Sequence, residues 1–374
     1  MKLNLKKVII VVLIIIILLA ILFFAFRNNE EVTSTNEIGN IVTNNLINEA
    51  NTLVVNMTEE QEEQAWEWQH DTLQNHNINA SAITSVHSTI DSYPINAEVI
   101  VDEYYKDGYD QKSVFTLQST SKSVTSALIG IAIDKGYIPS VNEPISTYFP
   151  QILDSGSEYK SQITIWNLLT HTIGLNASDT ANWNEWLASD NWVDYVLERP
   201  ATSRPGTVFS YFTGNTHLLS AIIQQATGKT AYEFGKEYLF DPLDMNSVQC
   251  STDPQGISDG GNGFAMNIYD MAKFGELYLN NGNWNGEQII SEQWVKDSTT
   301  LQFDRSSGSA DYRYQWWVRT FGENNHPAYF AQGHYGQYIF VVPDLDLVVA
   351  ITSHYEGSTS VYWQIMNNIV NACD

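Results

Sequence analysis

One short segment, Ser119-Thr120-Ser121-Lys122, places a nucleophilic hydroxyl one helical turn before an amine. Side chains three residues apart lie on the same face of a helix, so the hydroxyl and the amine can meet. Residues 124–133 are almost entirely apolar, which predicts a buried helix with Ser119 and Lys122 at its N-terminus. A lysine kept neutral by burial and by the positive end of the helix dipole can accept the serine proton. The serine is thereby activated as a nucleophile.

Two other serines also stand in patterns that could supply a nucleophile. Ser157-Glu158-Tyr159-Lys160 repeats the Ser-x-x-Lys spacing, but it lies in a polar connection with an acidic residue beside the serine. Gly256-Ile257-Ser258-Asp259-Gly260 satisfies G-x-S-x-G, the nucleophile elbow, which needs a hydrophobic strand before it and a helix after it. Neither flank is present, so we interpret residues 256–260 as a glycine-rich loop and favour Ser119 as the nucleophile.

The elements that must position Ser119 and Lys122 are distributed unevenly along the chain. Helical patterns fill the middle, between about residues 120 and 300, and a final helix is predicted over residues 358–371. Alternating hydrophobicity predicts strands near both ends of the chain, at residues 85–90, 98–105, 312–319, 328–332, 336–342 and 347–352, with 344–346 as a hairpin connection. This arrangement predicts an α+β fold: an antiparallel sheet from N- and C-terminal strands, flanked by helices, with a mainly helical lobe between them.

The first 57 residues have the composition of a membrane anchor followed by a stalk. Residues 8–26 are uninterruptedly apolar, close to the ~20 residues that a helix needs to cross a bilayer. Three lysines precede this run and a single arginine follows it, which predicts a cytoplasmic N-terminus. We therefore predict a transmembrane segment at 1–27, a polar linker at 28–57 and an extracytoplasmic domain at 58–374 that opens with a helix at 58–75. A cleaved signal peptide, releasing a secreted protein, is the alternative; no small-x-small cleavage site follows the apolar run.

Composition excludes several classes of partner. Because 18 Lys and Arg stand against 43 Asp and Glu, the net charge is −25, which argues against a nucleic-acid partner. No metal-binding spacing such as H-E-x-x-H and no glycine-rich phosphate loop after a strand occurs, so we expect neither a metal nor a cofactor. The two cysteines, Cys250 and Cys373, either form a disulfide in an oxidising compartment or remain as two thiols.

Five segments, in order, resemble the serine β-lactamase and penicillin-binding-protein superfamily. The resemblance is to its class C-like branch, which includes esterases, D-aminopeptidases and 6-aminohexanoate-dimer hydrolases. It extends over nearly everything from about residue 80 to residue 371, and the matching segments are residues 115–137, 163–175, 205–228, 263–294 and 333–343. The resemblance implies a β-lactamase/transpeptidase-like fold.

The resemblance also implies roles for individual residues. Ser119 would be the acyl-forming nucleophile, Lys122 its activator, and Tyr211 the phenol that relays the proton. The third motif would be His334-Tyr335-Gly336, opening the strand beside the nucleophile, and Gln337 would supply a backbone N–H of the oxyanion hole. The second motif departs from Tyr-x-Asn, since it reads Tyr211-Phe212-Thr213-Gly214-Asn215. His171, within residues 163–175, would orient a turn by hydrogen bonds, and it is the best substitute base if Tyr211 does not serve.

These observations predict a serine hydrolase that cleaves an amide or ester of a small molecule or short peptide through a Ser119 acyl-enzyme. D-alanyl peptidase or β-lactamase activity is the alternative, as is a catalytically silent member that binds a cell-wall peptide. The motif segments 115–132, 209–231 and 327–342 contain no Asp or Glu. We therefore expect an uncharged cleft that accepts neutral or cationic substrates more readily than anionic ones.

Overall fold

A computed structural model describes most of the chain beyond residue 78. The described residues are 79, 81, 83, 84, 86, 95–99, 102–106, 108–299 and 311–373, and all of them belong to one compact unit, Trp68–Asp374. The predicted anchor at 8–26, the linker at 28–57 and the helix at 58–75 lie outside them. Within these ranges no helix is long and apolar enough to cross a membrane.

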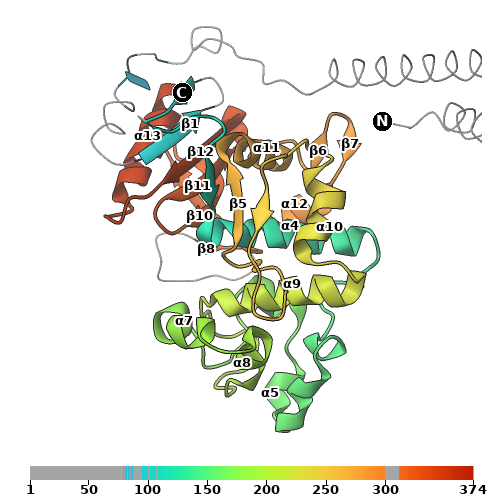
Figure 1. Cartoon of the computed structure of the whole chain (residues 1–374). Coiled ribbons are helices and arrows are strands. Elements are labelled where there is room, and N and C mark those ends of the chain that lie inside the picture. Colours follow the sequence, from blue (N-terminus) through green and yellow to red (C-terminus); the bar gives the residue numbers. More distant parts are fainter. Residues whose placement is uncertain are drawn as a thin grey trace, which may run out of the picture. The chain divides into compact units, whose positions relative to one another are not determined.

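The main sheet joins both ends of the described chain, as the sequence predicts (Figure 1). Seven antiparallel strands follow the order β2-β1-β12-β11-β10-β9-β8, so the first strand lies beside the last. Its strands are β1 (Ile95–Val99), β2 (Asp102–Tyr104), β8 (Asp311–Tyr312), β9 (Trp317–Phe321), β10 (His326–Gly333), β11 (Gln337–Val342) and β12 (Leu347–Ser353).

Helices cover both faces of the central strands. Helix α13 (Ser360–Cys373) packs on one face in the main hydrophobic core, and α11 (Ile268–Leu279) packs on the other. Gly275 of α11 lies directly against Ile339 of β11 and Val348 of β12. Because both faces are covered, every residue of β11 and β12 is buried, which accounts for their nearly continuous apolar sequences.

The helical lobe is built around α4 (Ser121–Asp134) and α9 (Thr213–Thr227), which pack against each other below the sheet in Figure 1. Residues 121–132 of α4 are all buried, which confirms the prediction of a helix without a polar face. Around this pair lie α5 (Glu158–Ser161), α6 (Ile165–Leu169), α7 (Asp179–Leu187), α8 (Trp192–Glu198), α10 (Ala231–Gly235), the π-helix Lys236–Phe240 and α12 (Glu292–Thr299).

Short strands and turns complete the lobe. The 3₁₀ turn η1 (Gln118–Thr120) leads into α4, and a small sheet in the order β3-β5-β4 lies beside it. The remaining short elements are β3 (Val114–Thr116), β4 (Gln249–Cys250), β5 (Phe264–Asn267), the hairpin β6 (Asn283–Trp284) and β7 (Glu287–Gln288), and the 3₁₀ turns Ile145–Thr147, Pro150–Ser155 and Pro343–Leu345. The predicted connection at 344–346 and the final helix are both confirmed.

The strand predicted at 85–90 is wrong at residue 86, the one position of this range that the structure describes. Residue 86 is helical, as are residues 81, 83 and 84 before it. Ile83 and Val86, three residues apart, are both buried, so they share one helical face. A six-residue pattern of apolar positions fits either period, and tertiary packing decides between them here.

Two other predicted strands are each divided into an antiparallel pair. The stretch 98–105 becomes β1 and β2, with Val99 opposite Asp102, and 312–319 becomes β8 and β9 around a turn. In the second case Gln315 adopts a left-handed conformation with φ 64°, while its neighbours Tyr314 and Trp316 are buried. In both stretches the sequence alternates between apolar and polar residues without a Gly or Asn that would predict a division into two strands. Cys250 and Cys373, both described, are not joined in a disulfide.

Gly275→Ala tests the close approach of α11 to the sheet. A Cβ at this position would lie 2.6 Å from Val348 Cγ1 and 2.9 Å from Ile339 Cγ2, so helix and sheet must separate. We expect the free energy of unfolding to fall by about 1–3 kcal/mol, as overpacking of a filled core usually does. Chemical denaturation measures the change, with Glu276→Ala as a control on the same helix. Equal stability of Gly275→Ala and the parent would contradict the packing described.

Candidate active site

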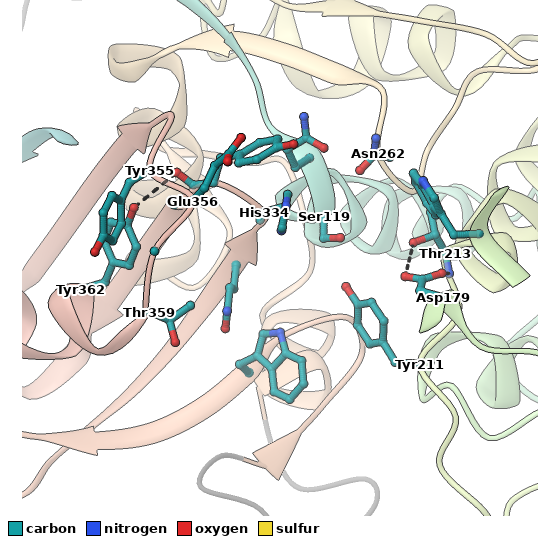
Figure 2. Close-up of a pocket in the computed structure, with 18 residues that line it drawn as sticks. Ser119, Asp179, Tyr211, Thr213, Asn262, His334, Tyr355, Glu356, Thr359 and Tyr362 are labelled. Atoms are coloured by element: carbon teal, nitrogen blue, oxygen red, sulfur yellow. Dashed lines mark hydrogen bonds between the residues drawn. The ribbon is translucent and has the colours of Figure 1, made fainter. Parts of the chain in front are cut away.

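A cavity of about 680 Å³ contains most of the residues that the sequence singled out (Figure 2). Ser119, Tyr211 and Thr213 line it from the helical lobe, while the sheet contributes the turn between β10 and β11 and the β12–α13 connection. Lys122 lies just behind the cavity wall, because it is only 1% exposed. The cavity therefore brings together segments from distant parts of the chain around one serine hydroxyl.

The Ser-x-x-Lys spacing brings the two side chains into contact. Lys122 Nζ lies 3.0 Å from Ser119 Oγ, 2.9 Å from Thr213 Oγ1 and 2.8 Å from the carbonyl oxygen of Gly261. Burial lowers the pKa of the Lys122 amine from 10.5 to about 8, although the carboxylates of Asp179 and Asp259 partly oppose this effect. A lysine with this pKa is neutral in a large fraction of molecules near pH 8, so it can accept a proton from the serine.

Tyr211 stands on the other side of the nucleophile. Its phenol faces Ser119 (Figure 2), and Lys122 Nζ lies 5.0 Å from the centre of its ring. Burial raises the pKa of the Tyr211 phenol well above its ordinary value, and the nearby Ser119 hydroxyl offsets only part of this. The phenol therefore keeps its proton at neutral pH. Of the two groups beside Ser119, Lys122 is the better base and Tyr211 the better proton donor.

His171 orients Tyr211 rather than facing the cavity. Its ring lies 4.6 Å from the Tyr211 ring, and Nδ1 lies 3.1 Å from the side-chain amide nitrogen of Asn215. Burial, together with the nearby Lys122 amine, holds the pKa of His171 well below its usual value, so the imidazole is neutral. Asn215, the asparagine of the second motif, is thus turned to His171. Thr213 occupies the sequence position of Asn in the family's Tyr-x-Asn form, and it lines the cavity.

The third motif forms a turn instead of opening a strand. β10 ends at Gly333 and β11 begins at Gln337, so His334, Tyr335 and Gly336 make the connection. Gly336 has φ 92° and packs so closely on Tyr362 that a Cβ would lie 1.8 Å from its hydroxyl oxygen. Only glycine satisfies both conditions. Because a φ of 92° is not an extended conformation, β11 begins after Gly336, at Gln337.

Of the three residues predicted to bind substrate or the oxyanion, two line the cavity and the third, Gln337, does not. His334 and Gly336 line the cavity, as does Gly333. Gln337 is buried behind the cavity wall, where its carbonyl oxygen accepts a hydrogen bond from Thr120 Oγ1 at 3.0 Å and its side chain donates to Ser353. The first residue of β11 is thereby pinned to η1, which carries the nucleophile.

The two competing serines have structural roles. Ser157 caps α5 by accepting a hydrogen bond from the backbone N–H of Lys160, whose amine donates to the carbonyl oxygen of Leu197. Ser258 is buried in the 256–260 loop, where its hydroxyl accepts from the backbone N–H of Tyr232. Neither serine lines the cavity.

Several residues of the cavity escaped the sequence analysis. Asp179, Trp183 and Asn262 line it from the helical lobe, and Glu356 lines it from the β12–α13 connection. The expectation of an uncharged cleft is therefore wrong, because two carboxylates reach the cavity from segments outside the motifs. Among the described residues that line it there is no Lys or Arg. No local pattern marks Asp179, the first residue of α7, as a site residue, whereas Thr213 is visible as the third residue of the second motif.

Comparison with known proteins agrees with this geometry. The family model for Beta-lactamase matches residues 95–362, well over half of the chain. The chain belongs to this family. The match includes the nucleophile segment, the second motif and the turn after β10.

The chain is similar in sequence to family members whose names state different substrates. The chain is 24% identical over 289 residues to the 6-aminohexanoate-dimer hydrolase of Paenarthrobacter ureafaciens, covering 71% of this chain and 72% of the relative. It is 22% identical over 209 residues to the D-alanyl-D-alanine-carboxypeptidase/endopeptidase AmpH of Escherichia coli, covering 53% of this chain and 52% of that protein.

Solved structures share the fold of this family member. A candidate 6-aminohexanoate-dimer hydrolase from Bacillus anthracis superposes with a TM-score of 0.65 at 24% identity, covering 76% of this chain and 79% of the other. An octameric penicillin-binding protein homologue from Pyrococcus abyssi superposes with a TM-score of 0.60 at 18% identity. The superposition covers 78% of this chain and 76% of that chain. At these identities the likeness establishes the β-lactamase-like α+β fold.

The low pKa of Lys122 predicts the pH dependence of acylation. Because only the neutral amine accepts the serine proton, the labelling rate of Ser119 by a fluorophosphonate should rise with pH and be half-maximal near the Lys122 pKa of about 8. Below that value the rate should fall about tenfold per pH unit. Stopped labelling reactions measure the rate, after subtraction of the probe's own hydrolysis at each pH. A flat profile between about pH 6 and about pH 9 would contradict Lys122 as the base.

Proposed function

We propose that this protein is a serine hydrolase that cleaves an amide or ester through a Ser119 acyl-enzyme. The observation that carries the proposal is the 3.0 Å contact between Ser119 Oγ and the buried amine of Lys122, at the wall of a 680 Å³ cavity. An amine with a pKa lowered to about 8 is suited to general-base catalysis near neutral pH. Removing a lysine amine from water costs free energy, so its burial beside a serine hydroxyl is consistent with a catalytic role.

The reaction proceeds in two halves. Lys122 accepts the proton of Ser119 as the hydroxyl attacks the substrate carbonyl, and the negative charge develops on the carbonyl oxygen. Backbone N–H groups of Ser119 and of Gln337, at the start of β11, are the proposed oxyanion donors; one such donor is commonly worth about 3 kcal/mol. Tyr211, protonated until this point, gives its proton to the leaving group and becomes a phenolate. In the second half the Tyr211 phenolate takes a proton from the attacking water, and the Lys122 ammonium returns a proton to Ser119 Oγ as the acyl group leaves.

The similarity to a 6-aminohexanoate-dimer hydrolase supports a linear amide or ester as the first-ranked substrate class. The match to AmpH, named as a carboxypeptidase and endopeptidase for D-alanyl-D-alanine, supports a D-peptide as the second. A β-lactam ranks below both. We further propose that the apolar segment 8–26 anchors the domain on the extracytoplasmic side, on the charge asymmetry of its flanks.

Ser119→Ala tests the nucleophile. We expect it to abolish both labelling by a fluorophosphonate probe and hydrolysis of p-nitrophenyl esters, because the Ser119 hydroxyl contacts Lys122 at the open cavity. The other hydroxyl that contacts Lys122 among the described residues, that of Thr213, is 1% exposed and donates its hydrogen to Asp179. Ser157→Ala and Ser258→Ala are matched controls from the competing patterns and should keep labelling. Labelling retained by Ser119→Ala would refute the mechanism, and a folded wild type without turnover on esters, linear amides, D-alanyl peptides or nitrocefin would favour the silent, peptide-binding alternative.

The acidic lining predicts a preference for cationic substrates. At low ionic strength, an ester with an ammonium group should have a kcat/KM about fivefold or more above that of its matched carboxylate analogue, equivalent to roughly 1 kcal/mol. The preference should shrink with added salt and in Glu356→Gln, whereas Glu287→Gln, on the exposed β7 hairpin, should leave it unchanged. Equal kcat/KM for the two esters would remove the electrostatic argument.

A further inference from the structure

Thr213 lies between the active-site lysine and a carboxylate that no motif contains. Lys122 Nζ is 2.9 Å from Thr213 Oγ1, which in turn donates to Asp179 Oδ2 at 2.8 Å. The other carboxylate oxygen, Asp179 Oδ1, accepts the backbone N–H of Thr213 at 2.7 Å. Figure 2 shows Asp179 and Thr213 joined at one end of the cavity, across from Ser119. Thr213 is only 1% exposed, so its hydroxyl is largely shielded from water, while Asp179 is partly exposed to the cavity.

The Thr213 hydroxyl has a single hydrogen, and this determines whether Thr213 donates to Lys122 or accepts from it. A carboxylate only accepts hydrogen bonds, so the Thr213 hydrogen is committed to Asp179. Thr213 Oγ1 can then act toward Lys122 only as an acceptor. The second contact of the amine, the Gly261 carbonyl oxygen at 2.8 Å, is likewise only an acceptor.

A second buried carboxylate holds that other acceptor in place. Asp259 accepts hydrogen bonds from the backbone N–H groups of Gly261 and Asn262, at 3.2 and 3.1 Å. It therefore shapes the turn that presents the Gly261 carbonyl oxygen to Lys122. Each of the two acceptors around the amine is thus positioned by its own aspartate, one from α7 and one from the 256–263 loop.

These constraints determine where the lone pair of a neutral lysine points. The neutral amine has two N–H bonds and one lone pair, and two of its three neighbours can only accept. Both N–H bonds are therefore used by Thr213 and Gly261. The lone pair is left for the third neighbour, Ser119 Oγ, at 3.0 Å.

We propose that Asp179 and Thr213 are positioning residues that direct the lone pair of neutral Lys122 at the Ser119 hydroxyl. The inference rests on the proposed function and concerns how the base is held ready for proton transfer. It assigns to Thr213, where the family's second motif has Asn, a role toward the lysine. It also explains why Asp179 is tied to both the backbone and the side chain of the first residue of α9.

The charged and titratable groups that face Lys122 come from four segments. Asp179 and Asp259 raise the pKa of the amine, while burial lowers it by more. Tyr211 and His171 complete the surroundings, and both are neutral because burial raises the pKa of the phenol and lowers that of the imidazole. Removing the charge of Asp179 should therefore lower the pKa of Lys122, which a loss of packing alone would not do.

Thr213→Val tests the acceptor with a side chain of the same shape. At pH values where Lys122 is fully neutral, we expect the fluorophosphonate labelling rate to fall about tenfold or more, because the amine can rotate away from Ser119. Thr213→Ser retains the hydroxyl and should restore most of the rate. Thr216→Val, which removes another buried hydroxyl of α9 bonded to Gln315, is the control for structural damage. A wild-type plateau in Thr213→Val would overturn the proposal.

Asp179→Asn provides an independent measurement that remains available if Thr213→Val fails to fold. We expect a lower plateau together with a shift of the pH midpoint to lower pH, since the charge that raises the Lys122 pKa is lost. A uniform loss at every pH, with the midpoint unmoved, would overturn the proposal. Ser119→Ala distinguishes the two levels: if it is still labelled, the proposed function fails. If it is silent while both positioning variants behave like the parent, only the positioning role fails.

Discussion

The architecture of the site depends on one requirement, the burial of a lysine amine beside a serine hydroxyl. An amine taken out of water must find acceptors for its N–H groups, or its burial is strongly unfavourable. Lys122 finds them on the first residue of α9 and on the 256–263 loop, and its third neighbour is the Ser119 hydroxyl on η1. These segments are far apart in the chain, so their convergence on one nitrogen couples the interior of the helical lobe to the nucleophile.

Close packing around that amine also accounts for the glycine-rich loop that imitates a nucleophile elbow. A Cβ on Gly260 would lie 2.6 Å from Thr125 Oγ1 of α4, and one on Gly261 would lie 2.6 Å from Thr213 Cγ2 of α9. The glycines let the backbone approach both central helices closely enough for the Gly261 carbonyl oxygen to reach Lys122. On the opposite side, Gly333 allows β10 to approach Leu117, just before η1, so the sheet forms the second rigid wall.

Sequence reasoning succeeded where a feature depends on neighbouring residues and missed those that depend on tertiary contacts. Helix α4 and strands β10 to β12 could be predicted because continuous apolar runs reflect burial on both sides. The Ser119–Lys122 contact follows from one helical turn. Asp179 reaches the site only because α7 begins beside α9, and no local spacing encodes that proximity. The turn inside 312–319 was hidden because buried side chains, among them Tyr314 and Trp316, continue through it.

Several non-glycine residues around the same site have left-handed backbone conformations, which cost conformational free energy. Gln118, directly before the nucleophile, and Tyr335, in the turn after β10, adopt left-handed conformations with φ 51° and 61°. His171 and Gln315, which pack behind Tyr211 and α4, do so with φ 53° and 64°. Each such residue costs roughly 1 kcal/mol relative to glycine. Glycine would relieve the strain but would remove the side chains of Gln118 and Tyr335 that line the cavity, and the imidazole that supports Tyr211. The positions are therefore held by their contacts, and stability is given up where the nucleophile and its proton donor must be oriented.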